Sequence, residues 1–517
     1  MMKIVKKIKL CLFFIMISLC LVQCSSGGDD LVTPEEESEE EGVGITPFPG
    51  MDLYGLVADV DGNPIKGVVV SDGYTCVITD EDGVYQMKKN EDAEFVYYST
   101  PASCKVETES SQNTVAKFYK SLGANSRYDF FLQKLDAPES DFTVVGIGDP
   151  QPSSTANLNR FRNETVADLK NYFDGWSEPV YSLVLGDIVS DKPVLLGQMK
   201  ALLGTIGMPS FVAIGNHDKV AESNTSLPRN SDEFESVFGP VNYSFNRGDV
   251  HFVCLDNVVF SSSSKYSGGF SDEQIDWLKE DLSYVSKDKM LIVYYHIPVR
   301  GTSGIQNRSA FLEALEGYAE VHLFSGHTHY NENYKHSSPL SAYEHVHAAA
   351  CGAWWKSTIN GDGTPNGYAV YRVSGASLKN WYYKPTGESA EIQIRLHAGD
   401  RYYGGEYAHY SYEKGENTVV ANVWNADEDW KIEAFEDGVK VADLVALSKS
   451  TRDAWALGYH IGVLNRNPDN YSPACKHLFL HTMQNPEAQL EIRATDPFGN
   501  VYSQNVLVSD FSSAVAE

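Results

Sequence analysis

Five short apolar runs in this sequence each end directly in side chains that bind metal ions or transfer protons. The clearest is Phe211 to Lys219, FVAIGNHDK, where a strand-like run releases Asn216, His217 and Asp218 in succession. The other four runs lead in the same way to Asp149 and Gln151, to Asp187, to His296, and to His327 and His329. The carboxyl ends of strands in an open α/β sheet gather on one edge, so we expect these side chains to meet in one crevice.

The order of these elements along residues 142 to 330 is D-x-Q, G-D, G-N-H-D, H and G-H-T-H. This order resembles that of the calcineurin-like metallophosphoesterases, and five elements in the right order are more specific than any one of them. The resemblance implies an α/β fold with a four-layer α/β/β/α core and two divalent metal ions. It assigns the first metal to Asp149, Gln151, Asp187 and His329, and the second to Asp187, Asn216, His296 and His327. Asp187 would bridge the two ions.

His217 and Asp218 directly follow the predicted ligand Asn216, and we expect both to have a catalytic role. Two cations roughly 3.5 to 4 Å apart can activate a bridging water and hold the phosphoryl oxygens of a substrate. His217 would donate a proton to the leaving oxygen, a role typically worth about 10²- to 10⁴-fold in rate. Asp218 would orient the imidazole of His217. We therefore expect a metal-dependent phosphoric ester hydrolase that cuts a phosphomonoester or a phosphodiester.

Gln151 stands where the family usually has a histidine. An amide oxygen is a harder and weaker ligand than imidazole, so Gln151 should shift the first metal position away from tightly held Zn²⁺. We expect two divalent ions, at least one of them labile, with Mn²⁺ favoured at one or both positions and Zn²⁺, Fe²⁺ or Mg²⁺ as alternatives.

The first 51 residues have the composition of an export signal and a tether. Lys3, Lys6, Lys7 and Lys9 precede the apolar run Leu10 to Val22, which is too short to span a bilayer and predicts a signal peptide over residues 1–23. Leu21 to Cys24 resembles a lipobox, with Cys24 carrying the lipid. The acidic residues 24–51 predict a solvated tether. We expect an outer-membrane lipoprotein in the periplasm or on the cell surface, or alternatively an exported protein without a lipid anchor.

The formal charge of -29 over 517 residues excludes some classes of partner. Such an acidic surface repels nucleic acid and anionic membrane, so we expect no nucleic-acid binding. The expected substrate is a small-molecule or surface-polymer phosphoester, which bound cations would attract locally. The sequence contains neither a Walker loop nor a glycine-rich dinucleotide motif, so nothing supports nucleotide-driven or hydride chemistry.

Two further regions flank the predicted phosphoesterase domain of residues 136–345. Residues 52–135 contain short strand-like runs separated by Asp-Gly turns, a pattern typical of a β-sandwich. Their segment GLVADVDGNPIKGVVVSDG resembles carboxypeptidase regulatory-like domains. Residues 346–517 contain aromatic and β-branched runs that predict a third, mostly β domain. That domain resembles the C-terminal domain of some exported calcineurin-like phosphoesterases.

Five cysteines lie outside the predicted signal peptide and lipobox: Cys76, Cys104, Cys254, Cys351 and Cys475. An odd number without C-x-x-C spacing argues against a zinc-thiolate site and against a dense disulfide scaffold. Cys76 and Cys104 have two interpretations, a disulfide within the small domain or two buried apolar side chains.

Four residues soon after the last metal motif are candidates for substrate contacts. Trp354 and Trp355 could wall the crevice and stack on a base, a sugar or a lipid headgroup, with Asp362 and Asn366 beside them. The alternative is that the tryptophans belong to the core of a β domain.

The whole chain also has two other interpretations. One is a nucleotide pyrophosphatase, within the same class of enzymes. The other is a non-catalytic surface binding protein whose β domains hold a glycan or a protein.

Overall fold

The computed structural model describes residues 44–221, 228–301, 304–399, 415–448, 450–467, 471, 473–508 and 511. The predicted signal peptide, the lipobox-like Leu21 to Cys24 and most of the predicted tether lie outside the described residues. Residues from Pro47 onward pack as one unit. Within the described ranges, the structure contains no helix that is both long and apolar enough to cross a membrane.

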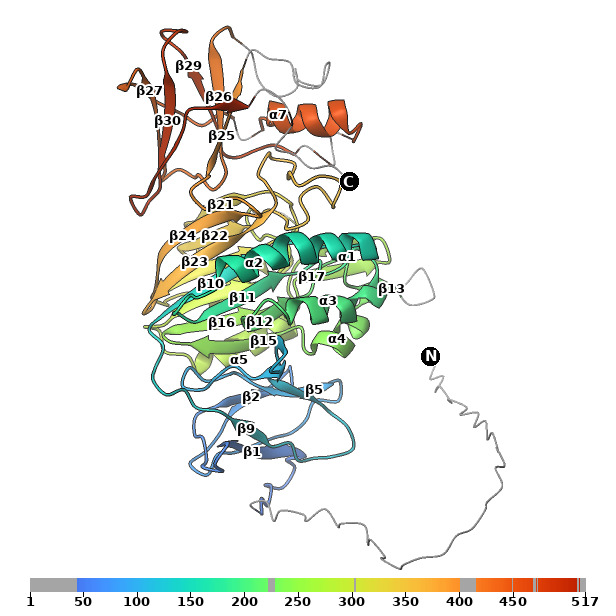
Figure 1. The fold of residues 1–517 in the computed structure, drawn as a ribbon. Coiled ribbons are helices and arrows are strands. Elements are labelled where there is room, and N and C mark those ends of the chain that lie inside the picture. Colours follow the sequence, from blue (N-terminus) through green and yellow to red (C-terminus); the bar gives the residue numbers. More distant parts are fainter. Residues whose placement is uncertain are drawn as a thin grey trace, which may run out of the picture. The chain divides into compact units, whose positions relative to one another are not determined.

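Two mixed β-sheets form the centre of the fold (Figure 1). The strands of the first sheet are, in spatial order, β24 (Ser377–Pro385), β23 (Gly367–Ser374), β10 (Asp141–Ile147), β11 (Val180–Leu185), β12 (Ser210–Ala213), β7 (Asn113–Ala116) and β6 (Thr108–Ser110). Within it β10, β11 and β12 are parallel neighbours. Their side chains are apolar on both faces because both faces of the sheet are covered.

The second sheet is also parallel at its centre. Its strands are, in spatial order, β15 (Tyr243–Arg247), β16 (Val250–Cys254), β19 (Met290–Tyr294), β20 (Glu320–Ser325), β22 (Ala342–Val346) and β21 (Glu332–His336). Strands β16, β19, β20 and β22 run parallel to one another. The two sheets therefore supply two sets of parallel strands to one domain.

Helices cover the outer faces of both sheets. The first sheet carries α1 (Thr155–Phe161), a π-helical turn at Arg162–Val166, α2 (Ala167–Tyr172), α3 (Leu196–Leu203) and α4 (Asp232–Phe238). The second carries α5 (Asp272–Ser283) and α6 (Arg308–Ala314). Helix α5 begins at a capping box in which Ser271 and Gln274 bond to each other's backbone. The predicted four-layer α/β/β/α core is confirmed.

An aromatic layer joins the inner faces of the two sheets. Phe211 of β12 stacks on Phe245 of β15 with ring centroids 3.6 Å apart, and Phe245 stacks on Phe252 of β16 at 4.4 Å. All three rings are buried. Because rings packed in this way hold the sheets face to face, the carboxyl ends of the parallel strands reach a common edge.

The region before the core is β-rich, as predicted. One sheet contains β4 (Val84–Met87), β1 (Leu53–Asp59) and β9 (Phe130–Leu132), and the other contains β3 (Cys76–Ile78), β2 (Val69–Ser71), β5 (Phe95–Tyr98) and β8 (Tyr119–Ser121). Trp277 of α5 donates a hydrogen bond to Ser71 Oγ over 3.0 Å and ties this region to the core. The five cysteines of the described chain are buried and free, so Cys76 and Cys104 are buried apolar side chains and not a disulfide.

The edges of the first sheet differ from the predicted domain boundaries. Strands β23 and β24 lie after residue 345, yet β23 pairs antiparallel with β10 from Asp141 to Gly146 and so belongs to the core sheet. On the other edge β7, from within residues 52–135, pairs with β12 through Val115 and Ser210. Turn spacing cannot show such pairings, because they join segments far apart in the sequence.

The last part of the chain forms two four-stranded sheets, again β-rich as predicted. The first contains β29 (Leu478–Thr482), β26 (Thr418–Val423), β25 (Ile394–Ala398) and β32 (Leu507–Val508), and the second contains β28 (Val439–Asp443), β27 (Lys431–Glu436), β30 (Leu490–Thr495) and β31 (Val501–Gln504). A shared apolar cluster, which includes Leu396, Val423 and Ile492, joins the two sheets.

Candidate active site

The predicted metal ligands lie just beyond the carboxyl ends of strands from both sheets. Asp149 and Gln151 follow β10, Asp187 follows β11, Asn216 follows β12, His296 follows β19, and His327 and His329 follow β20. The structure brings them into two groups that share Asp187, one with His296 and His327 and the other with Asp149 and His329. In each group the candidate ligand atoms all lie within 4.8 Å of one another.

Asp187 is the most connected residue of the site. Its Oδ1 accepts a hydrogen bond from the backbone N–H of His217 over 2.9 Å and lies 3.3 Å from His296 Nε2. Its Oδ2 accepts from Gln151 Nε2 over 3.0 Å. Burial alone would raise the pKa of this carboxyl, but the neighbouring His296 outweighs it, so the pKa of Asp187 is lowered and the group is ionised.

Two glycines in the motifs allow the backbone to approach these carboxylates. A Cβ added to Gly215 would lie 2.3 Å from Asp187 Oδ1, and a Cβ added to Gly326 would lie 2.5 Å from Asp149 Oδ2. Both distances are far shorter than any van der Waals contact. The glycines of G-N-H-D and G-H-T-H are therefore needed because no side chain fits beside the carboxylates.

Backbone strain is concentrated at the same place. Twelve non-glycine residues of the described chain have positive φ, and five of them are predicted metal ligands: Asp149, Gln151, Asp187, His327 and His329. A left-handed backbone at an ordinary side chain costs free energy and persists only where the surroundings enforce it. The observed outliers therefore mark this strand edge as a functional site.

His296 is fixed by the residues around it. Its Nδ1 lies 2.8 Å from the carbonyl oxygen of Leu185, so Nδ1 carries the proton and Nε2 is left as the ligand atom. That Nε2 lies 3.0 Å from Asn216 Oδ1 and 3.2 Å from His327 Nδ1. Asn257, which follows β16 and has no predicted role, accepts hydrogen bonds from the backbone N–H groups of His296 and Ile297. Asn257 lies just after β16, a strand of the sheet that also contains β19, and this position after a strand is the sequence signal that could have identified it.

The donor set fits two divalent cations. It combines two carboxylates, three imidazoles and two amide oxygens, a mixture that first-row divalent metals accept. Gln151 Oε1 is buried and has no hydrogen-bond partner among the residues described, so it is an acceptor left over for a cation. Burial, followed by the charge of His296, lowers the pKa of His327 to about 4, so that this imidazole is neutral and able to offer a lone pair. Burial also disfavours the charged form of His296, but the charge of Asp187 outweighs it and raises the pKa of His296 to about 9, so a cation would have to displace a proton from His296 Nε2.

The structure gives His217 a different partner from the predicted one. His217 Nδ1 lies 2.8 Å from Asp191 Oδ2, and Asp191 also pairs with Arg229. Burial lowers the pKa of His217, but the hydrogen bond that its imidazole donates to Asp191 and the charges of Asp187 and Asp191 outweigh burial and raise the pKa. The His217 side chain keeps 32% of its surface exposed, so a substrate can reach it.

Asp218 does not orient His217, which corrects the prediction. Its carboxylate accepts hydrogen bonds from the backbone N–H groups of Val189 and Gly215, over 2.9 and 2.8 Å. Burial and the nearby charge of Asp187 raise the pKa of this carboxyl. Asp218 therefore holds the two loops after β11 and β12 together, and Asp191, only four residues beyond Asp187, takes the predicted orienting role.

The side chains of the two predicted tryptophans lie in different places. Trp354 lies over His329 with ring centroids 4.5 Å apart and also contacts Tyr471 at 5.2 Å. Trp355 is buried against Phe161 of α1, and its Nε1 donates a hydrogen bond to the carbonyl oxygen of Pro150. Trp354 thus stays a candidate for a substrate contact, whereas the prediction for Trp355 is corrected because the helix layer covers that ring.

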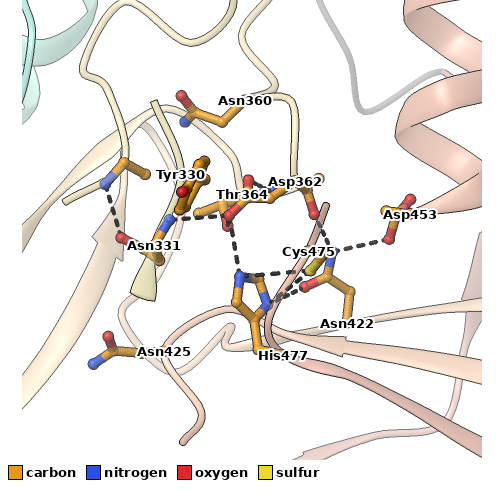
Figure 2. A network of polar contacts seen from close by, with 12 residues as sticks. Tyr330, Asn331, Asn360, Asp362, Thr364, Asn422, Asn425, Asp453, Cys475 and His477 are labelled. Atoms are coloured by element: carbon orange, nitrogen blue, oxygen red, sulfur yellow. Dashed lines mark hydrogen bonds and ion pairs between the residues drawn. The ribbon is translucent and has the colours of Figure 1, made fainter. Parts of the chain in front are cut away.

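Asp362 is also not a substrate residue. Figure 2 shows it inside a polar network between the loop after His329 and the C-terminal domain. It is fully buried, and its carboxylate accepts hydrogen bonds from the Asn331 and Thr364 backbones, the Thr364 hydroxyl and His477 Nε2, over 2.9 to 3.0 Å. The fourth predicted residue, Asn366, is buried as well and bonds to the Ala350 carbonyl oxygen, in the wall of a cavity of about 510 Å³ beside α2.

Replacing Asp362 with asparagine should destabilise the protein and leave KM unchanged. The amide offers hydrogen-bond donors to a site that already presents four, so buried donors lose their acceptor, at a cost of about 1–3 kcal/mol each. We expect a clear drop in the thermal unfolding midpoint. Asp288→Asn, on an exposed carboxylate, is the control. An unchanged midpoint with a raised KM would restore Asp362 as a substrate contact.

Three family models match this chain in consecutive segments. "N terminal of Calcineurin-like phosphoesterase" matches residues 51–135, "Calcineurin-like phosphoesterase" matches residues 142–331, and "C terminal of Calcineurin-like phosphoesterase" matches residues 344–502. A curated relative, a probable cyclic nucleotide phosphodiesterase of Rhodococcus erythropolis, is 22% identical over 166 residues. That match covers 30% of this chain and 53% of the relative, so the chain spans about half of the relative's length.

Solved structures with similarity include two phosphatases. A dimetal phosphatase from Danio rerio is 17% identical, with a TM-score of 0.35, and the match covers 48% of this chain and 96% of that one. The purple acid phosphatase PPD1 from yellow lupin seeds is 13% identical, with a TM-score of 0.35, and the match covers 62% of this chain and 67% of that one. Because models of all three parts of one family match in order from residue 51 to residue 502, the chain belongs to the calcineurin-like phosphoesterases, a family of metal-dependent hydrolases.

Proposed function

We propose that this protein hydrolyses a phosphomonoester or a phosphodiester at a centre of two divalent cations. The observation that carries the proposal is the pair of ligand groups that share the buried Asp187. A shared carboxylate is what two cations need in order to lie close together despite their mutual repulsion. The match of residues 142–331 to the calcineurin-like phosphoesterases supports the same conclusion.

The residues take two kinds of role in this proposal. Seven would hold the cations: Asp149, Gln151, Asp187, Asn216, His296, His327 and His329. When bound, the cations supply Lewis acidity toward the phosphoryl oxygens and lower the pKa of the attacking water. His217 donates a proton to the leaving oxygen through Nε2, because Asp191 occupies its Nδ1.

Asp191 is itself held in place, which keeps the acid in position. Arg229 pairs with Asp191, donates a hydrogen bond to the carbonyl oxygen of Ser263 over 3.0 Å, and lies over the ring of Phe260 at 5.3 Å. A side chain fixed by several contacts loses little freedom when the substrate binds, so the imidazole is already oriented in the free protein.

Two aromatic rings are the proposed contacts for the alcohol part of the substrate. Trp354 lies over His329, and Tyr266 of β18 (Lys265–Gly268) lies edge-on to His327 with centroids 5.9 Å apart. Tyr266 is 41% exposed, so its ring is open to a ligand. Each predicted metal position thus has an aromatic neighbour that can pack on an apolar group.

The substrate class is tested with protein freed of metal by chelation and assayed with and without added Mn²⁺. p-Nitrophenyl phosphate and bis-p-nitrophenyl phosphate separate monoesterase from diesterase activity. Nucleotides then test the pyrophosphatase alternative, and 3′,5′-cyclic nucleotides test the activity named for the Rhodococcus relative. We expect the chelated protein to be inert and Mn²⁺ to restore turnover. If no ester is cut with any metal, the result favours the alternative of a non-catalytic surface binding protein.

Gln151 makes the metal preference testable in the same assay. An amide oxygen is a hard ligand that suits Mn²⁺ better than Zn²⁺. We therefore expect Mn²⁺ to reactivate the chelated protein better than Zn²⁺ does. Gln151→His should tighten Zn²⁺ binding and reduce the advantage of Mn²⁺. Full activity of the unaltered protein only with zinc at both positions would show that Gln151 does not set the preference.

A further inference from the structure

A second cavity lies between the core and the C-terminal domain. It has a volume of about 390 Å³, within the range of pockets that enclose small molecules. The edge of the second core sheet, β21 and β22, forms one wall. The other wall consists of the loop between β26 and β27 and parts of the segments around residues 445 and 476. None of the predicted metal ligands lines it.

The lining combines aromatic rings with charged groups of both signs. The rings are those of Tyr334, Tyr343, Trp430 and Phe479. The charged groups are the carboxylates of Glu332, Asp427 and Glu428 and the ammonium groups of Lys335 and Lys476. A strongly anionic ligand would face the carboxylates and a strongly cationic one would face the lysines. A purely apolar ligand would displace the water around these charged groups without replacing its hydrogen bonds.

Contacts across the cavity hold the polar groups in place. The hydroxyl of Tyr343 donates a hydrogen bond to Asp427, and Lys335 pairs with Asp429 and with Glu428. Asn333 donates a hydrogen bond to the carbonyl oxygen of Asn425 over 2.9 Å. Burial raises the pKa of Asp427 to about 6, because a carboxylate that is partly removed from water is harder to ionise. The walls are therefore built before any ligand arrives.

One donor in this lining has no partner. The Nε1–H of Trp430 is buried, the residue is 8% exposed, and no acceptor for it lies within hydrogen-bond distance in the described part of the chain. A buried N–H without an acceptor costs about 1–3 kcal/mol, and this one is shielded from the cavity as well as from water. Trp430 stacks on Tyr502 with centroids 6.0 Å apart, so its ring is held in this position.

We propose that this cavity binds a neutral sugar ring, as a free sugar or as the terminal unit of a glycan. A sugar ring presents C–H faces that pack on aromatic rings, and hydroxyl groups that both donate to carboxylates and accept from ammonium groups. Its lack of net charge suits a lining in which carboxylates and lysines are mixed. The site is independent of the metal centre and does not rest on the proposed hydrolysis.

The test is isothermal titration of the full chain with methyl glycosides of glucose, galactose, mannose and N-acetylglucosamine, with saturation-transfer NMR on the same samples. We expect at least one glycoside to bind with a dissociation constant between about 10 μM and a few mM. Chelation of metals should leave that binding unchanged. Failure of the whole panel to bind overturns the proposal, whatever the protein does with phosphoesters.

Three variants tie binding to this cavity. Asp427→Asn removes a carboxylate, Tyr343→Phe removes the hydroxyl and keeps the ring, and Trp430→Phe reduces the aromatic surface of the wall. We expect each to weaken glycoside binding at least about tenfold, because each removes either a buried hydrogen bond to the sugar or aromatic surface that packs on it. The matched control is Asp92→Asn, because Asp92 lines a different cavity, of about 880 Å³, near the N-terminal domain. Wild-type affinity in all three variants, with unfolding midpoints like that of the control, also overturns the proposal.

Discussion

Asp187→Asn should reduce phosphoesterase activity by at least about 10³-fold, close to background, and should remove both metals together. The asparagine has nearly the same shape, so it can still accept from the His217 backbone N–H, but it carries no charge to hold two cations close to each other. The expected loss corresponds to about 4 kcal/mol of transition-state stabilisation. Metal content by mass spectrometry and turnover of bis-p-nitrophenyl phosphate measure the two effects.

Variants of ligands that belong to only one of the two groups test whether Asp187 is shared by two metals. Asp149→Asn removes a ligand of only one group, and His296→Ala removes a ligand of only the other, so each should retain about one metal per chain. The exposed Asp288→Asn should behave like the unaltered protein. Retention of two metals and of more than about a tenth of the activity in Asp187→Asn would exclude a bridging role.

The core and the position of the candidate site could be predicted because the relevant pattern is local. Each predicted ligand follows an apolar strand within a few residues, and the carboxyl ends of parallel strands lie at one edge of a sheet. The same rule applies to Asp149 after β10 and to His296 after β19, although they belong to different sheets. The aromatic layer of Phe211, Phe245 and Phe252 that joins the sheets has no such local signal.

The partner of His217 could not be predicted because neighbours in sequence are not neighbours in space. Asp218 follows His217 directly, but its side chain turns back to the backbone N–H groups of Val189 and Gly215. Asp191 reaches the imidazole from another loop, where it adopts a positive φ of 52°. A loop conformation of that kind leaves no periodic pattern in the sequence.

The sequence also could not show which of the two tryptophans lies at the site. Trp354 and Trp355 both have positive φ, at 49° and 61°, and their rings point to different places, one over His329 and one into the layer beneath α1. Composition indicates an aromatic cluster but not which ring is exposed. Asp362, whose residue type suits a ligand contact, is instead part of a buried network that requires the C-terminal domain to be in place.

His217→Gln should lower kcat by about 10²- to 10⁴-fold for alkyl phosphoesters and should leave the metal content unchanged. His217 is not among the predicted ligands, and its contact with Asp187 uses the backbone N–H, which the substitution retains. The loss should be far smaller for p-nitrophenyl esters, because p-nitrophenolate leaves readily without a proton. Parallel assays with an alkyl and a p-nitrophenyl ester of the same phosphoryl group measure this difference.

Asp191→Asn separates positioning from proton donation. The Asp191 carboxylate raises the pKa of His217, so its removal should lower that pKa and move the high-pH decline of kcat for alkyl esters to lower pH. The shift has this sign because the acid must be protonated to act, and a lower pKa means that it loses its proton earlier as pH rises. We expect a loss of about tenfold at neutral pH, smaller than in His217→Gln.

The comparison of leaving groups can also contradict the role of His217 as the acid. If His217→Gln slows hydrolysis of the alkyl and the p-nitrophenyl ester equally, His217 binds the phosphoryl group and another residue protonates the leaving oxygen. The reason is that the loss of an acid at the leaving oxygen slows a basic leaving group more than a weakly basic one.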